Sequence, residues 1–195
     1  MLYEIAHFLR DRMPWIWDFV DMLNSWLFSL RYGRKLRDAL PTSLKGSGQL
    51  IVVAMREIET DELVQFFAHQ PEEAFRYFRP HGFDAVSIKK LQKNKAFLAY
   101  VIKDGEQIAG YCFIRSFFFG KGFRGRMVDI NYRGKGLGTM MNKLLNEVGF
   151  GIGLRLYETV NKDNIASYRS ALSASNVKVV EELDAGDLYL EILKD

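Results

Sequence analysis

The sequence predicts an α/β protein of the α+β type, in which helices flank a mixed, mostly antiparallel sheet and a helical extension precedes the domain. From residue 49 onward, β-type runs and amphipathic segments follow in the order β-α-α-β-β-β-α-β-α-β-β. Asp104-Gly105 separates two of the β-type runs, as is typical of a hairpin. Residues 1–40 have helical spacing, and residues 41–48 resemble a linker. We therefore expect an amphipathic helical extension and linker over residues 1–45 and one domain over residues 46–195.

Local patterns predict the individual elements. β-type runs predict strands over residues 50–58, 96–103, 107–119, 126–131, 154–160, 177–183 and 188–193. Apolar residues at helical spacing predict helices over residues 14–30, 60–69, 71–78, 84–94, 137–148 and 164–174. Pro14 suits the first turn of its helix, and Thr60 is a suitable N-cap. The turn Asp184-Ala-Gly-Asp187 folds the last two strands back on each other.

The N-terminal helix is amphipathic. One face carries large apolar residues, namely Trp15, Ile16, Phe19, Met22, Leu23, Trp26, Leu27 and Leu30. A basic flank follows, namely Arg31, Arg34, Lys35 and Arg37. This combination is typical of a helix that lies on an anionic membrane surface, as a peripheral contact. We favour packing of the apolar face on its own domain or in a homodimer, because Asp18 and Asp21 disfavour contact with anionic lipid.

The composition is that of a globular protein. The 195 residues are 48% hydrophobic and 26% charged, enough for one well-buried domain plus an appendage. The net charge of +3 is too small to favour nucleic-acid binding, so no nucleic-acid partner is expected. Cys112 is the single cysteine, which excludes an internal disulfide, and its apolar surroundings predict burial. Neither a signal peptide nor a membrane span is indicated, and we expect a cytoplasmic protein.

The most informative segment is the glycine-rich turn that begins at Arg133. A β-type run precedes this turn, and the amphipathic helix over residues 137–148 follows it. Glycines allow close approach of the backbone, and the free N–H groups at a helix N-terminus attract anions. Arg133 and Lys135 add positive charge that suits phosphate. The alternative is an ordinary connection between a strand and a helix.

A second glycine-rich segment has the glycine spacing of a dinucleotide-binding pattern but not the structural context that such a site requires. Gly120-Lys-Gly-Phe-Arg-Gly125 has the spacing G-x-G-x-x-G. A dinucleotide site requires a helix directly after the glycines, whereas a strand-like run follows here. We therefore interpret this segment as a hairpin connection. The turn at Arg133 is not a nucleotide-triphosphate loop either, because Thr139 follows Gly138 where that loop has Lys-Ser or Lys-Thr.

Arg133-x-x-Gly136-x-Gly138 resembles the (Arg/Gln)-x-x-Gly-x-(Gly/Ala) signature of the GNAT superfamily of acyl-CoA-dependent N-acetyltransferases. The approach is similar to that family's Val-x-Pro-x-Tyr, with Ile130 in place of Pro. The resemblance implies the GNAT fold over residues 49–193, with acetyl-CoA (coenzyme A) as co-substrate. It also implies a set of cofactor-binding residues in the strand and the turn: Met127, Val128, Arg133, Gly134, Lys135, Gly136, Leu137, Gly138 and Thr139.

A second segment, further along the chain, also resembles the family. Residues 160–168 are similar to Asn-x-x-Ala-x-x-x-Tyr, which implies that Asn161 and Asn164 help to hold the cofactor. On this match Tyr168 is the general acid that protonates the departing thiolate. Helix capping by Asn164 and simple packing of Tyr168 are the alternatives. The family's Gly-Phe after the tyrosine is missing here.

The acceptor amine must be neutral to react, so a base is needed, directly or through water. His81 is the candidate, because it titrates near neutrality and precedes a helix on the expected acceptor side. Asp129 and Asp84 are the next candidates. No cluster with metal-ligand spacing is present, so no metal is predicted.

These patterns together predict an N-acetyltransferase that moves an acetyl group from acetyl-CoA to a primary amine of a small molecule or a peptide. Two aromatic-rich segments, residues 75–79 and 117–119, suit an amino sugar as acceptor. Peptide N-termini, polyamines and lysines are the other acceptors to consider. The alternative function is a non-catalytic acyl-CoA-binding or membrane-surface module that works through its N-terminal helix.

Overall fold

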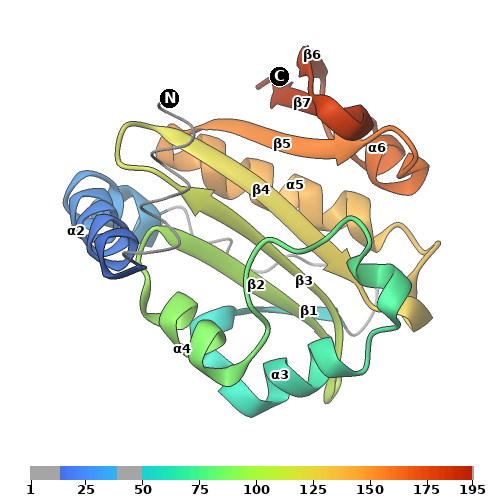
Figure 1. Ribbon diagram of the computed structural model, residues 1–195, viewed down its shortest axis with the longest axis horizontal. Helices are drawn as coiled ribbons and strands as arrows, with labels where there is room; N and C mark the ends of the chain where they lie inside the picture. Colours follow the sequence, from blue (N-terminus) through green and yellow to red (C-terminus); the bar gives the residue numbers. More distant parts are fainter. Residues whose placement is uncertain (1–13, 39–49, 195) are drawn as a thin grey trace.

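The computed structural model describes residues 14–38 and 50–194, which form a seven-stranded sheet with helices on both faces (Figure 1). The strand order is β1-β2-β3-β4-β5-β7-β6. The strands are β1 (Leu50–Ala54), β2 (Phe97–Asp104), β3 (Gln107–Ser116), β4 (Lys121–Val128), β5 (Arg155–Asn161), β6 (Val177–Glu182) and β7 (Asp187–Ile192). Only β4 and β5 pair in parallel among these neighbours. The predicted fold class is confirmed.

Helices cover the sheet on two sides. They are α2 (Pro14–Asp38), α3 (Thr60–Ala68), α4 (Ala85–Lys93), α5 (Leu137–Ile152) and α6 (Ile165–Leu172). β3 shows why both faces are buried: Cys112 and Ile114 join the core under α5, whereas Tyr111 and Phe113 join the core under α3 and α4. Successive side chains of a strand point to opposite faces, so an apolar run such as β3 serves both cores.

The pairing between β4 and β5 is short. Only residues 121–123 pair with residues 155–157, although β4 continues to Val128 and β5 continues to Asn161. Beyond the paired residues the two strands diverge, and backbone groups of both are released from the ladder. This divergence lies at the centre of the sheet and creates the cleft described below.

Several predicted boundaries are wrong. β1 ends at Ala54, and a 3-10 helix, Met55–Glu57, occupies the end of the expected strand. The helix expected over residues 71–78 is a single 3-10 turn, Glu72–Phe75. Thr60 does not cap α3, because its hydroxyl donates to the side chain of Gln92 at 2.9 Å. A tertiary partner has replaced the local one.

The segment that we expected to be a hairpin connection is mostly strand. β4 begins at Lys121, so Gly122 and Gly125 lie inside it. A Cβ on either glycine would lie 2.6 Å from a side-chain atom of β3, of Ile114 and Phe113 respectively. Glycine is required here because large core side chains of the neighbouring strand occupy the space.

The helix α2 differs most from its prediction. It continues to Asp38 instead of ending near residue 30, and it packs on the sheet through Phe28 and Tyr32, which are buried. Asn24 strengthens this contact by donating to the carbonyl of Ser116 at 2.9 Å. Packing of the predicted apolar face on its own domain is therefore wrong, because most of that face is exposed. The predicted domain boundary near residue 45 lies outside the described residues.

Candidate functional site

A cleft of about 1460 Å³ opens where β4 and β5 diverge. One end is formed by the glycine turn after β4 and the first residues of α5 and α6. The other end is formed by aromatic and basic residues of β3, β4 and the segment 73–80. The volume exceeds that of a pocket for one small ligand, so the cleft has room for two molecules side by side.

The glycine turn is open towards the cleft. Gly134 and Gly136 have φ values of +74° and +79°, and a Cβ built on either would meet no atom within 4 Å. Gly136 is also the N-cap residue of α5, and no side chain caps this helix. The first N–H groups of a helix need a partner from outside it, so an uncapped N-terminus beside an open turn suits an anion.

The structure brings almost all of the predicted cofactor-binding residues of this segment together. The members that line the cleft are Met127, Val128, Arg133, Gly134, Gly136, Leu137, Gly138 and Thr139. Lys135 is the exception, because it does not line the cleft and its Nζ donates to the carbonyl of Asn131 at 3.1 Å. The positive charge expected from Lys135 is thus directed away, and Arg133 supplies charge at the turn.

Asn161 and Asn164 also line the cleft. The amide of Asn161 donates to the carboxylate of Asp187 at 2.8 Å, and Asn164 caps α6 by accepting from the backbone N–H of Ser167 at 3.2 Å. Both side chains therefore hold the connection between β5 and α6 in place. Contact of either with a cofactor remains a prediction.

Tyr168, the predicted general acid, is partly buried, and its role remains a prediction. It packs against the core under α5 and does not line the cleft. The residues of α6 and its C-cap that do line it are Ala166, Ser167, Arg169, Ser170 and Ser173. Ala166 and Ser170 are each two residues from Tyr168, so Tyr168 lies roughly opposite them, on the core side of the helix. The sequence resemblance could supply the residue type but not the face of the helix.

We expect Tyr168→Phe to leave turnover of the enzyme close to that of the wild type, because only a core-facing hydroxyl is removed. Steady-state kinetics with saturating acetyl-CoA measure this directly. Ser170→Ala on the cleft side of α6 serves as the matched comparison. A Tyr168→Phe variant at least tenfold slower in turnover, with unchanged thermal stability, would restore Tyr168 as proton donor.

His81, the predicted base, is half-buried against the aromatic core under α3 and α4. Its Nδ1 donates to the carbonyl of Gly82 at 2.8 Å, and its Nε2 is 3.0 Å from the hydroxyl of Tyr111. The rings of Phe67 and Phe97 surround it edge-on. Burial lowers the pKa of His81, more than the hydrogen bond with Gly82 raises it. His81 does not line the cleft, and its role as the base remains a prediction.

The burial of His81 has a consequence for stability. Because burial lowers its pKa in the folded protein, the unfolded chain binds the proton more readily, and stability falls as the pH drops below about 6.5. We expect His81→Gln to lose less stability than the wild type between about pH 7 and pH 5. Denaturant unfolding at both pH values measures the difference. Equal losses in the two proteins would show that His81 does not contribute.

The other two candidate bases hold backbone turns. Asp84 caps α4 by accepting from the N–H groups of Val86 and Ser87, both at 3.0 Å. These bonds, with the Ser87 hydroxyl as the largest cause, lower the pKa of Asp84. Asp129 accepts from the amide of Gln70 at 2.7 Å. Neither carboxylate lines the cleft, so neither is placed to take a proton there.

A buried ionic cluster in the cleft was not predicted. The Nε of Arg124 on β4 donates to Glu158 on β5 at 2.7 Å, and Nη1 of the same arginine donates to Asn146 of α5. Arg126 donates both to Glu158, at 3.2 Å, and to the carbonyl of Ser167, at 2.8 Å. The cluster ties the diverging strands to α5 and α6. The only signal in the sequence is the presence of charged residues at alternate positions of a strand.

Burial dominates the electrostatics of this cluster. The side chains of Arg124 and Glu158 are 0% and 2% exposed. Desolvation lowers the pKa of Arg124, and the neighbouring Glu158 opposes that shift. One nitrogen of Arg124, Nη2, and one oxygen of Glu158, Oε1, have no partner among the described residues. The cluster therefore keeps one donor nitrogen and one acceptor oxygen buried without a partner in the described part of the chain.

The far end of the cleft is aromatic and basic. Its lining includes Arg76, Tyr77, Phe78, Arg79, Arg115, Phe117 and Phe123, together with the carboxylate of Glu73. Phe75, Phe118 and Phe119, the other members of the two aromatic segments, do not line it. The predicted aromatic acceptor side therefore exists in part.

Other kinds of chemistry find no support in the described residues. No group of three or more His, Cys, Asp or Glu side chains within residues 14–38 and 50–194 is placed to hold a metal ion. Cys112 is buried as predicted, and burial raises the pKa of its thiol. A protonated, buried thiol is a poor nucleophile.

Comparison with solved structures shows the same fold in several acetyltransferases. The GNAT domain of S. lividans PAT is 13% identical, with a TM-score of 0.64 over 73% of this chain and 89% of that one. Campylobacter jejuni N-acetyltransferase PseH in complex with acetyl coenzyme A is 15% identical, with a TM-score of 0.55 over 75% and 99%. Aminoglycoside acetyltransferase AAC(6')-Ib in complex with coenzyme A and kanamycin is 12% identical, with a TM-score of 0.54 over 73% and 93%.

The sequence itself was compared in two further ways. No curated protein sequence gives a significant match. A family model described as Acetyltransferase (GNAT) family matches residues 53–171, a span that contains the glycine turn, the diverging strands and most of α6. Because this match covers more than half of the protein, and the fold agrees with it, the chain belongs to the acetyltransferase (GNAT) family.

Proposed function

We propose that the protein is an N-acetyltransferase that transfers the acetyl group of acetyl-CoA to a primary amine. The observation that carries this proposal is the uncapped N-terminus of α5 beside the open turn at Gly134 and Gly136. Coenzyme A presents a pyrophosphate, and backbone N–H groups with a nearby Arg133 bind such a group well. The fit is supported because neither glycine has a neighbour within 4 Å of a built Cβ.

The remaining steps belong to the diverging strands. Acetyl-CoA supplies the acetyl thioester, and released backbone N–H groups of β4 polarise its carbonyl and hold it in line with the amine. The new C–N bond forms as the C–S bond breaks, so the amine loses a proton and the thiolate gains one. Among the cleft-lining carboxylates, Glu158 and Asp187 are held by Arg124 and Asn161. We propose that Glu73 at the acceptor end is the general base that accepts the proton of the amine, directly or through water.

The lining of the acceptor end favours an amino sugar over a polycation. Aromatic rings at Tyr77, Phe78 and Phe117 suit the apolar faces of a sugar ring. Arg76, Arg79 and Arg115 outnumber the carboxylate of Glu73 in the lining of this end, which makes this end positive. A polyamine or an aminoglycoside carries several positive charges and is repelled there. A neutral amino sugar, or one that bears a phosphate, is not repelled by this positive end. A peptide amine is the next candidate acceptor.

Acetyl-CoA turnover against a panel of amines tests this proposal. The panel contains glucosamine, glucosamine phosphate, a short peptide and spermidine, and the readout is release of the coenzyme A thiol. We expect the sugars to be acetylated and spermidine to be rejected. Binding of acetyl-CoA without turnover of any amine would instead favour the non-catalytic acyl-CoA-binding module. Because acetyl-CoA is made and used inside the cell, we propose a cytoplasmic location.

A further inference from the structure

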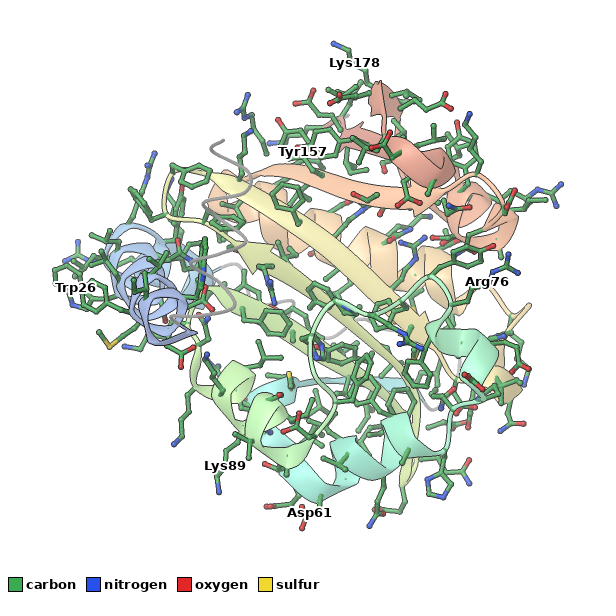
Figure 2. The ribbon with its side chains drawn as sticks, in the orientation of Figure 1. Trp26, Asp61, Arg76, Lys89, Tyr157 and Lys178 are labelled. Carbon is green, nitrogen blue, oxygen red and sulfur yellow. The ribbon has the colours of Figure 1, made fainter. Side chains whose placement is uncertain are left out.

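The outer face of α2 exposes an unusual amount of apolar surface. Six large apolar side chains between residues 19 and 30 are 41–67% exposed, namely Phe19, Val20, Met22, Leu23, Trp26 and Leu30. Figure 2 shows Trp26 on the outer side of α2, pointing away from the sheet. Exposed apolar residues of a soluble domain are normally scattered singly, so a continuous group of this kind marks an interaction surface.

This face is not needed to hold α2 on the domain. Phe28 and Tyr32, which do that, are 1% and 3% exposed. A helix turns by about 100° per residue, so Trp26 and Leu30 lie roughly opposite these two. The inner side also makes the polar contacts, such as the hydroxyl of Ser25 accepting from the backbone N–H of Lys95 at 2.9 Å. The helix is thus held in place with its aromatic side outward.

The exposed surface continues onto the turn between β3 and β4. Phe118 and Phe119 in this turn are 40% and 55% exposed. Asn24 accepts from the backbone N–H of Phe118, and Arg31 donates to its carbonyl, both at 3.0 Å. Figure 1 shows this turn beside α2. Two segments that are far apart in sequence therefore present one aromatic surface.

The charges around this surface indicate what it binds. Arg31 and Arg34 are exposed on the C-terminal half of α2, and Arg31 donates to the carbonyl of Phe118 in the aromatic turn. The acidic residues that argue against anionic lipid lie elsewhere on the helix. Asp18 pairs with Lys90 of α4. Asp21 is exposed, but it is seven residues before Phe28 and so points away from Trp26 and Leu30. The outer side is therefore aromatic with a basic border, as in helices that lie on membranes.

We propose that the outer face of α2, together with Phe118 and Phe119, docks the protein on an anionic membrane surface. Such surfaces combine burial of aromatic and aliphatic side chains at the headgroup level with attraction of basic residues to acidic lipids. No helix in residues 14–38 and 50–194 has the length and apolar content to cross a bilayer, so the contact is peripheral.

Docking in this way orients the cleft. Phe119 stacks on Phe117 with ring centroids 5.2 Å apart, and Phe117 contacts Phe123 at 6.0 Å. Phe117 and Phe123 line the acceptor end of the cleft, so a row of aromatic rings leads from the cleft to the exposed turn. Docking through Phe119 thereby brings Phe117 and Phe123, at the acceptor end, near the lipid surface. This consequence rests on the proposed acetyl transfer, whereas the docking itself does not.

Vesicle binding by the full chain tests the docking. All three tryptophans lie at residues 15–26, so their fluorescence reports on α2 alone. We expect the protein to sediment with vesicles of phosphatidylglycerol and phosphatidylcholine, with a blue shift of its emission. Vesicles of phosphatidylcholine alone are expected to bind it weakly. Added salt should release it from the anionic vesicles, because salt screens the basic residues.

Two variants locate the surface while they retain all three tryptophans. Phe19→Gln/Leu30→Gln removes apolar area from the helix, and Phe118→Gln/Phe119→Gln removes it from the turn. Each is expected to weaken vesicle binding by about tenfold or more, because burial of each side chain is lost. Val179→Gln/Val180→Gln is the matched control, since both residues are 46–47% exposed on β6, away from α2. The control should bind as the wild type does.

Three results would overturn the proposal. The first is a full chain that fails to sediment with anionic vesicles. The second is equal binding by the two variants and the control. The third is a stable dimer in sedimentation equilibrium that Phe19→Gln/Leu30→Gln dissociates, without vesicle binding, because the face would then be an interface between two copies. Acetylation of no amine would overturn the proposed function but leave the vesicle result unaffected.

Discussion

Replacing Gly136 with valine is expected to abolish the rise in melting temperature that acetyl-CoA causes in the wild type. A ligand at a hundred times its Kd stabilises a protein by about 2.7 kcal/mol, which corresponds to roughly 5–10 °C for a chain of this size. Gly136 has a φ of +79° and caps α5, so a β-branched side chain there strains the turn and fills the space in front of the helix N-terminus. Thermal unfolding with and without acetyl-CoA measures the effect.

Gly105 provides the control for this experiment. It also has a positive φ, +58°, and a Cβ there would meet no atom within 4 Å. It lies in the hairpin turn between β2 and β3 and does not line the cleft. Gly105→Val is therefore expected to lower the melting temperature of the free protein and to keep the shift caused by acetyl-CoA. A full shift in Gly136→Val would remove the turn from the binding site.

Glu158→Gln is expected to destabilise the protein by about 3–5 kcal/mol, a fall of roughly 10 °C in melting temperature. The carboxylate of Glu158 is shared by Arg124 and Arg126 in a buried cluster. An amide cannot neutralise the two guanidinium groups, so buried positive charge remains without a counter-charge. Chemical denaturation at neutral pH measures the change in the free energy of unfolding.

The exposed ion pair between Lys162 and Glu182 offers the comparison. Glu182→Gln removes one partner of a pair whose side chains are 48% and 58% exposed, and surface pairs contribute about 0–1 kcal/mol. A loss of stability in Glu158→Gln no larger than that of Glu182→Gln would show that water already compensates the buried arginines. The Arg124→Met/Glu158→Met double variant should cost less than Glu158→Gln, because one charge of each sign is removed together.

Patterns that depend on neighbouring residues predicted the structure well. Asp104-Gly105 forms the hairpin turn between β2 and β3, with Gly105 at positive φ. The glycine turn after β4 and the helix that follows lie where the sequence places them, and the turn forms one end of the cleft. These features require particular backbone dihedral angles and hydrogen-bond partners within a few residues, which local residue types determine.

Long-range packing sets which way a side chain faces and which groups it contacts. The fold class, the glycine turn and the amphipathic character of α2 could be predicted from residue patterns alone. Those patterns did not show that Phe28 and Tyr32 pack on the sheet while Trp26 points outward. Nor did they show that Arg124 meets a carboxylate 34 residues away, or that Tyr168 and His81 lie outside the cleft. The direction in which a helical side chain points depends on how the helix packs against the rest of the fold. A shift of one residue along the helix changes that direction by about 100°.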